Sequence, residues 1–173
     1  VIDAERALAE GGVDAGEVTF VVHATTVATN AIIEGKIARS GFVTTDGFRD
    51  LLEIARQVRP TLYDTQFEKA KPLVPRDRAV VVGERLGPKG EILRPLEDDS
   101  VREAAAVLRR EGVESVAVCL LHAYVNPEHE LRVGAILAEE LPGIPVSLSS
   151  EVAPEFREYL RASTTVINAV IRP

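Results

Sequence analysis

Apolar residues fall in two spacings along this chain, and together the two spacings predict a layered α/β fold. Short β-branched runs are typical of buried strands, and the run at residues 113–121 is almost unbroken, as in a central strand covered on both faces. Strands are predicted at residues 17–22, 38–44, 113–121 and 145–149. They alternate with helical spacings, which indicates a sheet with helices packed against it.

Helices are predicted where apolar residues recur every three to four positions or where capping residues occur. The clearest is residues 98–110, whose inner face carries Val101, Ala104, Ala105 and Leu108. Asn126 before Pro127 marks another start, because Asn caps a helix and Pro is preset for its first turn. The other predicted helices are residues 2–10, a helix capped by Thr25 and closed by Gly35, residues 47–56, residues 127–140, and one opened by Pro154 with Phe156, Tyr159 and Leu160 buried.

The middle of the chain interrupts this alternation. Residues 60–77 have little periodicity and several prolines, which indicates a long loop. Residues 78–84 and 91–94 flank the turn Gly87-Pro88-Lys89-Gly90 and predict a β-hairpin. Residues 60–97 are therefore interpreted as a loop and hairpin insertion within the domain.

The most informative segment for function is residues 23–31, HATTVATNA, directly after the first predicted strand. Thr26, Thr29 and Asn30 share one helix face with Ile33, so three polar side chains lie together at a strand-to-helix corner. Open α/β sheets place ligand sites at such corners. The structural alternative is that the threonines cap the helix and His23 is a satisfied core residue.

Composition narrows the classes of function. The chain of 173 residues has a formal net charge of −7 and dispersed basic residues, which argues against nonspecific nucleic-acid binding. No run approaches the roughly 18 apolar residues of a membrane span and no leader pattern occurs, so we expect a cytoplasmic domain without membrane contact. Cys119 lies in an apolar run and is interpreted as a core residue. Paired histidines and cysteine clusters are missing from the sequence, so no metal site is expected.

Four stretches carry a family resemblance: HATTVATNAIIEG, SGFVTTDGFRDLLEIARQVRP, VAVCLLHAYVNPEHE and SLSSEVAPEFREYLRASTTVINA. In this order and spacing the chain resembles the N-terminal region of the hydantoinase A and 5-oxoprolinase family from residue 17 onward. It departs from the family pattern at Ala24, at residues 55–60 and at Leu160, where the family has Gly, Gly-Arg-Gln-Asn-Arg-Pro and Glu. These departures bear on the substrate and leave the fold unchanged.

The resemblance implies part of an actin-like, sugar-kinase-like ATPase lobe, with a mixed, largely parallel sheet flanked by helices. Family members open with a glycine-rich Asp-x-Gly-Gly-Thr turn that contacts phosphate, and no such sequence occurs here. We therefore expect residues 1–173 to be a single α/β domain, a fragment of the N-terminal lobe of a larger protein. Residues 164–171 would form a helix near the hinge between lobes. ATP and Mg²⁺ are the implied cofactors, with the main nucleotide loops outside this chain.

The activity implied by the resemblance is ATP-dependent opening of hydantoin or 5-oxoproline-type rings. Phosphorylation of the amide oxygen turns it into a leaving group before water attacks, which requires positioned donors and a base. Two alternatives stay open: a subunit of an ATP-dependent ketone carboxylase of the acetone carboxylase type, and a noncatalytic lobe that docks a partner subunit. The implied partners are a small cyclic amide and a B-type hydantoinase subunit or domain, in an oligomer, and the fragment alone is expected to be inactive.

The candidate site residues follow from the polar corner and the resemblance. His23, Glu155 and Glu158 are the candidate catalytic residues. His23 would donate to a substrate or phosphate oxygen or act as a base, and the two glutamates would hold water or a metal ion. Candidate substrate or phosphate contacts are Thr25, Thr26, Thr29 and Asn30 at the helix entrance, and Arg56, Gln57 and Arg59, which would hold a carboxylate or ring carbonyl. The alternative for the arginines, with Arg49 nearby, is a solvated helix face. His122 ends a core strand and His129 lies within a helix, so both are weaker candidates.

Overall fold

The computed structural model describes residues 11, 12, 14, 26–58, 63, 66 and 69–172. The helix predicted at residues 2–10 and the strand predicted at 17–22 lie outside these residues. No helix in the described part of the chain is long and apolar enough to cross a membrane.

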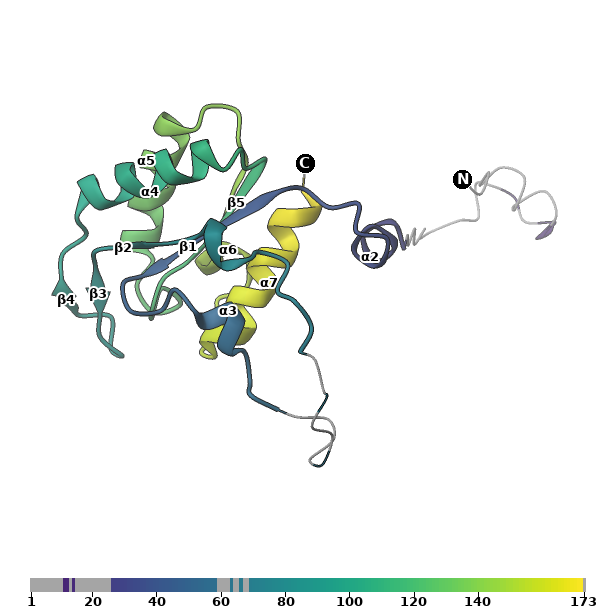
Figure 1. Ribbon diagram of the computed structural model, residues 1–173, viewed down its shortest axis with the longest axis horizontal. Coiled ribbons are helices and arrows are strands. Elements are labelled where there is room, and N and C mark those ends of the chain that lie inside the picture. Colours follow the sequence, from purple (N-terminus) through teal and green to yellow (C-terminus); the bar gives the residue numbers. More distant parts are fainter. Residues whose placement is uncertain are drawn as a thin grey trace.

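A four-stranded sheet forms the centre of the molecule (Figure 1). Its strands are β1 (Ser40–Thr45), β2 (Ala79–Val82), β5 (Ser115–Cys119) and β6 (Val146–Leu148), in the order β2-β1-β5-β6. All three neighbouring pairs are parallel. The antiparallel pair β3 (Arg85–Leu86) and β4 (Ile92–Arg94) forms a separate small sheet. The predicted α/β class with a largely parallel sheet is confirmed.

Side chains that alternate along the strands divide the core into two layers. Val43 and Val118 point into one layer, which holds α4 (Asp98–Arg110) and α5 (Glu128–Glu140). Phe42 and Ala117 point into the other, which holds α7 (Glu158–Ile171) and α3 (Leu51–Ile54). The remaining helices are α2 (Val27–Ile33), the 3-10 turn η2 (Arg76–Arg78) and α6 (Ser149–Val152).

Several helix predictions are confirmed in detail. Helix α4 has the predicted bounds, and its four predicted inner residues are all buried. Helix α5 begins directly after Pro127, and the Oδ1 atom of Asn126 accepts a hydrogen bond of 3.0 Å from the Glu128 amide, as expected of a capping asparagine. Cys119 is a buried free cysteine in the core, as predicted.

The predicted hairpin at residues 78–84 and 91–94 is wrong in its first arm. Residues 79–82 pair in parallel with β1, and only Arg85–Leu86 pair with β4. Val80 and Val82 are buried because they point into the same layer as Val43, so this segment is an integral edge strand of the sheet. The insertion predicted at residues 60–97 therefore contributes one strand to the main core.

Two helices are shorter than predicted. Within the predicted helix 47–56, regular α-structure covers only Leu51–Ile54, because Gly47 and Ala55 have positive φ angles of 89° and 51°. The helix predicted from Pro154 begins instead at Glu158, and Phe156 is 66% exposed rather than buried. Thr26 occupies the cap position of α2 without a side-chain capping hydrogen bond, and Thr25 lies outside the described residues.

Candidate functional site

The strand order creates a topological switch point between β1 and β5. Strand β2 lies on one side of β1 and β5 on the other, so the connections from the two central strands leave in opposite directions. Parallel sheets bind ligands outside the carboxyl ends of their strands at this place. Thr45 ends β1 here, and Leu120, Leu121 and His122 follow β5.

A buried polar network joins the carboxyl ends of three elements at the switch point. The hydroxyl of Thr45 donates to Glu84 Oε1 and accepts a hydrogen bond of 2.9 Å from the Leu121 amide. The other carboxylate oxygen of Glu84 lies 2.7 Å from Nδ1 of His129 on α5. Glu84 and His129 are both buried, so the pair lies inside the domain rather than on its surface.

A second buried network lies on the other side of the same loop. Glu130 on α5 accepts hydrogen bonds from the Leu120 amide at 2.8 Å, the Ser149 hydroxyl at 2.6 Å and the Ser150 amide at 2.8 Å. Arg161 on α7 donates from Nε to the Ser149 hydroxyl at 3.1 Å and from Nη2 to the Leu120 carbonyl at 2.8 Å. The buried carboxylate and the buried guanidinium are thus both hydrogen-bonded, as buried charges must be.

His122 stands where these two networks meet the end of β5. It has a positive φ of 59°, and its buried Nδ1 atom has no hydrogen-bond partner among the described residues. Its ring lies 6.1 Å from that of Tyr124, which also packs edge-on against Phe156 and beneath the guanidinium of Arg161. An aromatic ledge, consisting of His122, Tyr124 and Phe156, therefore borders the carboxyl ends of the sheet.

A narrow crevice lies at the carboxyl ends of β1 and β5, against the start of α7. Its volume of about 10 Å³ is near the smallest space that holds one water molecule. Thr44, Phe48 and Leu121 line it together with Glu158 and Arg161 from the start of α7. Of the two predicted catalytic residues that the structure describes, Glu155 and Glu158, it is Glu158 that lines this crevice at the switch point.

The predicted binding residues on α2 lie elsewhere. Thr26, Thr29 and Asn30 are exposed, and the side chains of Thr26 and Asn30 are 3.4 Å apart. Helix α2 precedes β1 and contacts α7 away from the main body (Figure 1). The Ala38 amide donates to the Val170 carbonyl near the end of α7, which puts this segment at the amino end of β1, opposite to Thr45.

The other predicted residues that the structure describes lie in two segments, one directly after α3 and one directly before α7. Arg56 and Gln57 follow α3 and are exposed, and Gln57 has a positive φ of 51°. The side chain of Glu155 is exposed, while its carbonyl accepts a 2.7 Å hydrogen bond from Arg161. His23, Thr25 and Arg59 lie outside the described residues. Arg49 is a structural residue, because it donates to the carbonyls of Ala79 and Arg76.

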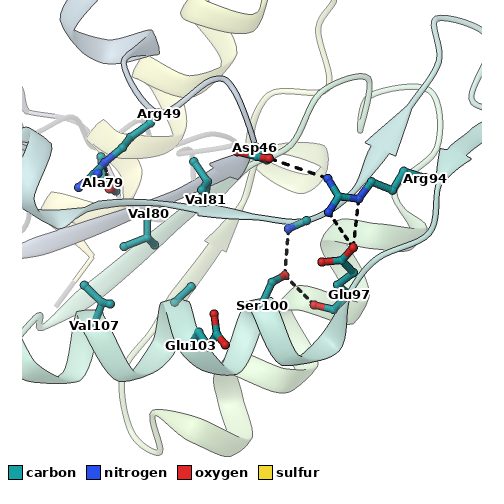
Figure 2. A pocket seen from close by; sticks show the side chains of 12 residues that line it. Asp46, Arg49, Ala79, Val80, Val81, Arg94, Glu97, Ser100, Glu103 and Val107 are labelled. Carbon is teal, nitrogen blue, oxygen red and sulfur yellow. Dashed lines mark hydrogen bonds and ion pairs between the residues drawn. The ribbon is translucent and has the colours of Figure 1, made fainter.

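A larger pocket of about 420 Å³ lies between the edge strand β2 and α4 (Figure 2). Three of its charged residues are paired with one another: Arg94 contacts Glu97 at 2.7 Å and Asp46 at 3.8 Å. The Ser100 hydroxyl accepts from the Gly83 amide at 2.9 Å. The pocket is a groove along a sheet edge, and these polar groups already bind one another.

Sequence reasoning named His129 as a weaker candidate and missed the other buried residues of the two networks. Glu130 shares the inner face of α5 with Val133 and Leu137, and Arg161 shares that of α7 with Thr165 and Ala169. A charged residue at a core position of an amphipathic helix was the available signal, because such a residue must find partners inside the fold.

The described residues lack a cluster of metal ligands, and the arginine buried at the switch point is already hydrogen-bonded. None of their His, Cys, Asp and Glu side chains form a group of three that could hold a metal ion. The buried cation at the switch point, Arg161, already donates to Ser149, Leu120 and Glu155, so it is not free for phosphate. Arg161 therefore does not offer a phosphate contact in this arrangement.

Comparison with known proteins agrees with this architecture. Residues 2–141 match the family model described as the hydantoinase/oxoprolinase N-terminal region. The chain is 36% identical to caprolactamase subunit alpha of Pseudomonas jessenii, over 88% of this chain and 22% of that protein. It is 35% identical to 5-oxoprolinase of Saccharomyces cerevisiae, over 86% of this chain and 14% of that protein.

Solved structures give the same relationship. Nucleotide-free acetone carboxylase matches with a TM-score of 0.85 and 29% identity, over 95% of this chain and 26% of that one. The ATP-dependent caprolactamase of Pseudomonas jessenii matches with a TM-score of 0.81 and 33% identity, over 96% of this chain and 26% of that one. The chain thus spans about a quarter or less of the length of these relatives. It belongs to the hydantoinase/oxoprolinase family, and its sequence corresponds to the family's N-terminal region.

Proposed function

We propose that the complete protein is an ATP-dependent hydrolase that opens cyclic amides of the hydantoin, 5-oxoproline or lactam type. The observation that carries the proposal is the similarity to caprolactamase subunit alpha and to 5-oxoprolinase over most of this chain. ATP dependence is supported by the similarity to a solved caprolactamase that is itself ATP-dependent. Mg²⁺ and a cytoplasmic location belong to the same proposal.

Amide chemistry explains what this region would have to supply. The carbonyl carbon of an amide is a poor electrophile, so ring opening needs donors around the amide and a group that positions the attacking water. Glu158 is the candidate for the water-positioning group, since it lines the crevice at the switch point. Two other residues stay catalytic candidates, His23 and Glu155. The candidates for substrate or phosphate contacts stay Thr25, Thr26, Thr29, Asn30, Arg56, Gln57 and Arg59.

A ketone carboxylase is the second candidate function. It is supported by the TM-score of 0.85 with acetone carboxylase and by 32% identity to the gamma subunit of acetophenone carboxylase from Aromatoleum aromaticum. Two of these relatives are named as subunits, which supports a B-type partner subunit or domain for this protein as well. A noncatalytic docking lobe is the remaining alternative.

The test is ATP consumption by the complete protein, purified together with its partner subunit. ADP release would be measured with 5-oxoproline, a hydantoin and caprolactam, and separately with acetone or acetophenone plus bicarbonate. Release that depends on a cyclic amide, together with the ring-opened product, is the expected result. Release only with ketone and bicarbonate supports the carboxylase, and no stimulation by any of these compounds contradicts both enzyme proposals.

A further inference from the structure

We propose that His122 contacts the substrate, with its imidazole hydrogen-bonded to the amide group that is opened. This inference rests on the proposed function and names a residue of the same site. It starts from the backbone of His122, which has a positive φ of 59° and lies three residues after the end of the central strand β5. A non-glycine residue in this region costs free energy, and such residues persist only where the surrounding structure holds them in place.

Three buried side chains fix the backbone of the two residues that precede His122. Glu130 binds the Leu120 amide, Arg161 binds the Leu120 carbonyl, and Thr45 binds the Leu121 amide. Thr45 is held in turn by Glu84, which pairs with His129. Two buried carboxylates and a buried guanidinium are thus committed to the two residues before His122, although burying charges is expensive.

The backbone after His122 is also fixed. The His122 carbonyl accepts hydrogen bonds from the Val125 amide at 2.9 Å and the Asn126 amide at 3.3 Å. Asn126 donates to the Gly90 carbonyl at 3.0 Å, which ties this turn to the β3-β4 hairpin. The turn is therefore rigid on both sides of the strained residue, which presents the imidazole in one orientation.

The imidazole of His122 is poorly stabilised by the described part of the chain. Its buried Nδ1 has no hydrogen-bond partner there, and an unsatisfied buried nitrogen costs about 1–3 kcal/mol. His122 is half-buried and directly follows Leu121, which lines the crevice together with Glu158. A histidine with a strained backbone, an unpaired ring nitrogen and hydrogen-bonded neighbouring residues is typical of a functional site.

An imidazole suits the proposed ligand because it can both donate and accept a hydrogen bond. An amide group has a carbonyl oxygen that accepts and an N–H that donates, so the imidazole can pair with either of them. The neighbouring ring of Tyr124, 6.1 Å from that of His122, is an apolar group of the kind that packs against the methylene groups of a ring.

The test separates strain from function through the variant His122→Gly in the complete protein with its partner subunit. Glycine adopts positive φ without strain, so a purely structural histidine would be replaced with unchanged activity and an equal or higher melting temperature. We expect instead that kcat/KM for the cyclic amide falls at least about tenfold while the melting temperature does not fall. His122→Asn should restore part of the activity, since Asn tolerates this backbone region and its amide donates and accepts.

Arg110→Ala is the control, because Arg110 is exposed in the last turn of α4 and lies outside the proposed site. It should leave kcat/KM unchanged. Wild-type kinetics in His122→Gly would overturn the assignment of His122 and leave the proposed function standing. A wild-type protein that is inactive with all the cyclic amides would instead refute the proposed function, and the role of His122 with it.

Discussion

Glu130 and Arg161 come from helices on opposite faces of the sheet, and the hydroxyl of Ser149 connects them. Ser149 donates to Glu130 Oε1 at 2.6 Å and accepts from Arg161 Nε at 3.1 Å. Helix α5 belongs to one core layer and α7 to the other. This connection passes the end of β6 and fixes the Leu120 peptide from both sides. The two helical layers and the carboxyl ends of the strands are therefore connected as one hydrogen-bonded unit.

Replacing Glu130 by Ala should loosen this unit locally. The amides of Leu120 and Ser150 would lose their acceptor inside the fold, and each unsatisfied buried group costs about 1–3 kcal/mol. Hydrogen exchange measured by mass spectrometry should become faster in peptides from residues 115–125 and 146–153. Peptides from α4 serve as the internal control, because their exchange rate should stay the same. An unchanged exchange rate in residues 115–125 and 146–153 would contradict the role of Glu130.

Two neighbouring threonines of β1 allow a matched comparison. Thr45→Val removes the donor to Glu84 and the acceptor of the Leu121 amide, whereas Thr44→Val removes only one hydrogen bond of 2.9 Å to the Cys119 carbonyl. Both residues are buried and the replacements have the same shape. We expect a loss of about 3 kcal/mol in the free energy of local unfolding for Thr45→Val and about 1 kcal/mol for Thr44→Val. The free energy of local unfolding would be measured by native-state hydrogen exchange. Equal losses in the two variants would show that the Glu84 network is not stabilising.

Gly41 is required by the packing of α4 on the sheet. A Cβ atom at this position would lie 2.6 Å from Cδ2 of Leu108, which is fully buried. Gly41→Ala should therefore lower the free energy of unfolding by about 1–3 kcal/mol. The double variant Gly41→Ala/Leu108→Ala should lose less than the sum of the two single variants, because the new methyl group enters the space left by leucine.

The control for Gly41 is Gly112→Ala. A Cβ atom added at Gly112 would meet nothing within 4 Å, so only the positive φ of 61° opposes alanine there. A loss of about 1–2 kcal/mol is expected from that backbone strain alone, with no coupling to Leu108. Additive losses in the Gly41 double variant, measured by chemical denaturation, would argue against the steric explanation.

Cys119 should be unreactive in the folded protein. Burial raises the pKa of its thiol from 9.0 to about 11, so the thiolate fraction at pH 8 is about a hundredfold lower than in an unfolded chain. Iodoacetamide labelling of the Cys119 peptide should be at least about a hundredfold slower in the native protein than in guanidinium. Because the unfolded thiol ionises first, the contribution of Cys119 to stability should fall as the pH rises from 9 towards 11. Rapid native labelling at pH 8 would contradict its burial.

The predicted substrate contacts can be tested in the complete enzyme. His23→Ala or Arg56→Ala should lower turnover at least about tenfold, the scale of one lost positioned contact. Arg110→Ala is the control, since Arg110 is an exposed residue at the last turn of α4. Wild-type kinetics in both His23→Ala and Arg56→Ala would remove these residues from the site.

Local patterns in the sequence are sufficient for the elements with regular spacing. They predict helix α4 with its bounds and inner face, and Asn126 as the cap of α5, because amphipathic spacing and capping depend on residues a few positions apart. The first arm of the predicted hairpin is wrong for the opposite reason. Val80 and Val82 pair with residues about forty positions away in β1, and a turn signal beside them says nothing about that partner.

The sequence by itself determined the α/β class, most helices and strands, the buried Cys119 and the family of this protein. Only the tertiary structure decided that β2 joins the central sheet, that α2 lies at the amino end of β1, and that Thr45, Glu84 and His129 meet at the carboxyl ends of the strands. The physical reason is distance along the chain. Periodicity records which face of an element is buried, but a hydrogen bond between residues 45 positions apart exists only after strand order and register have been fixed.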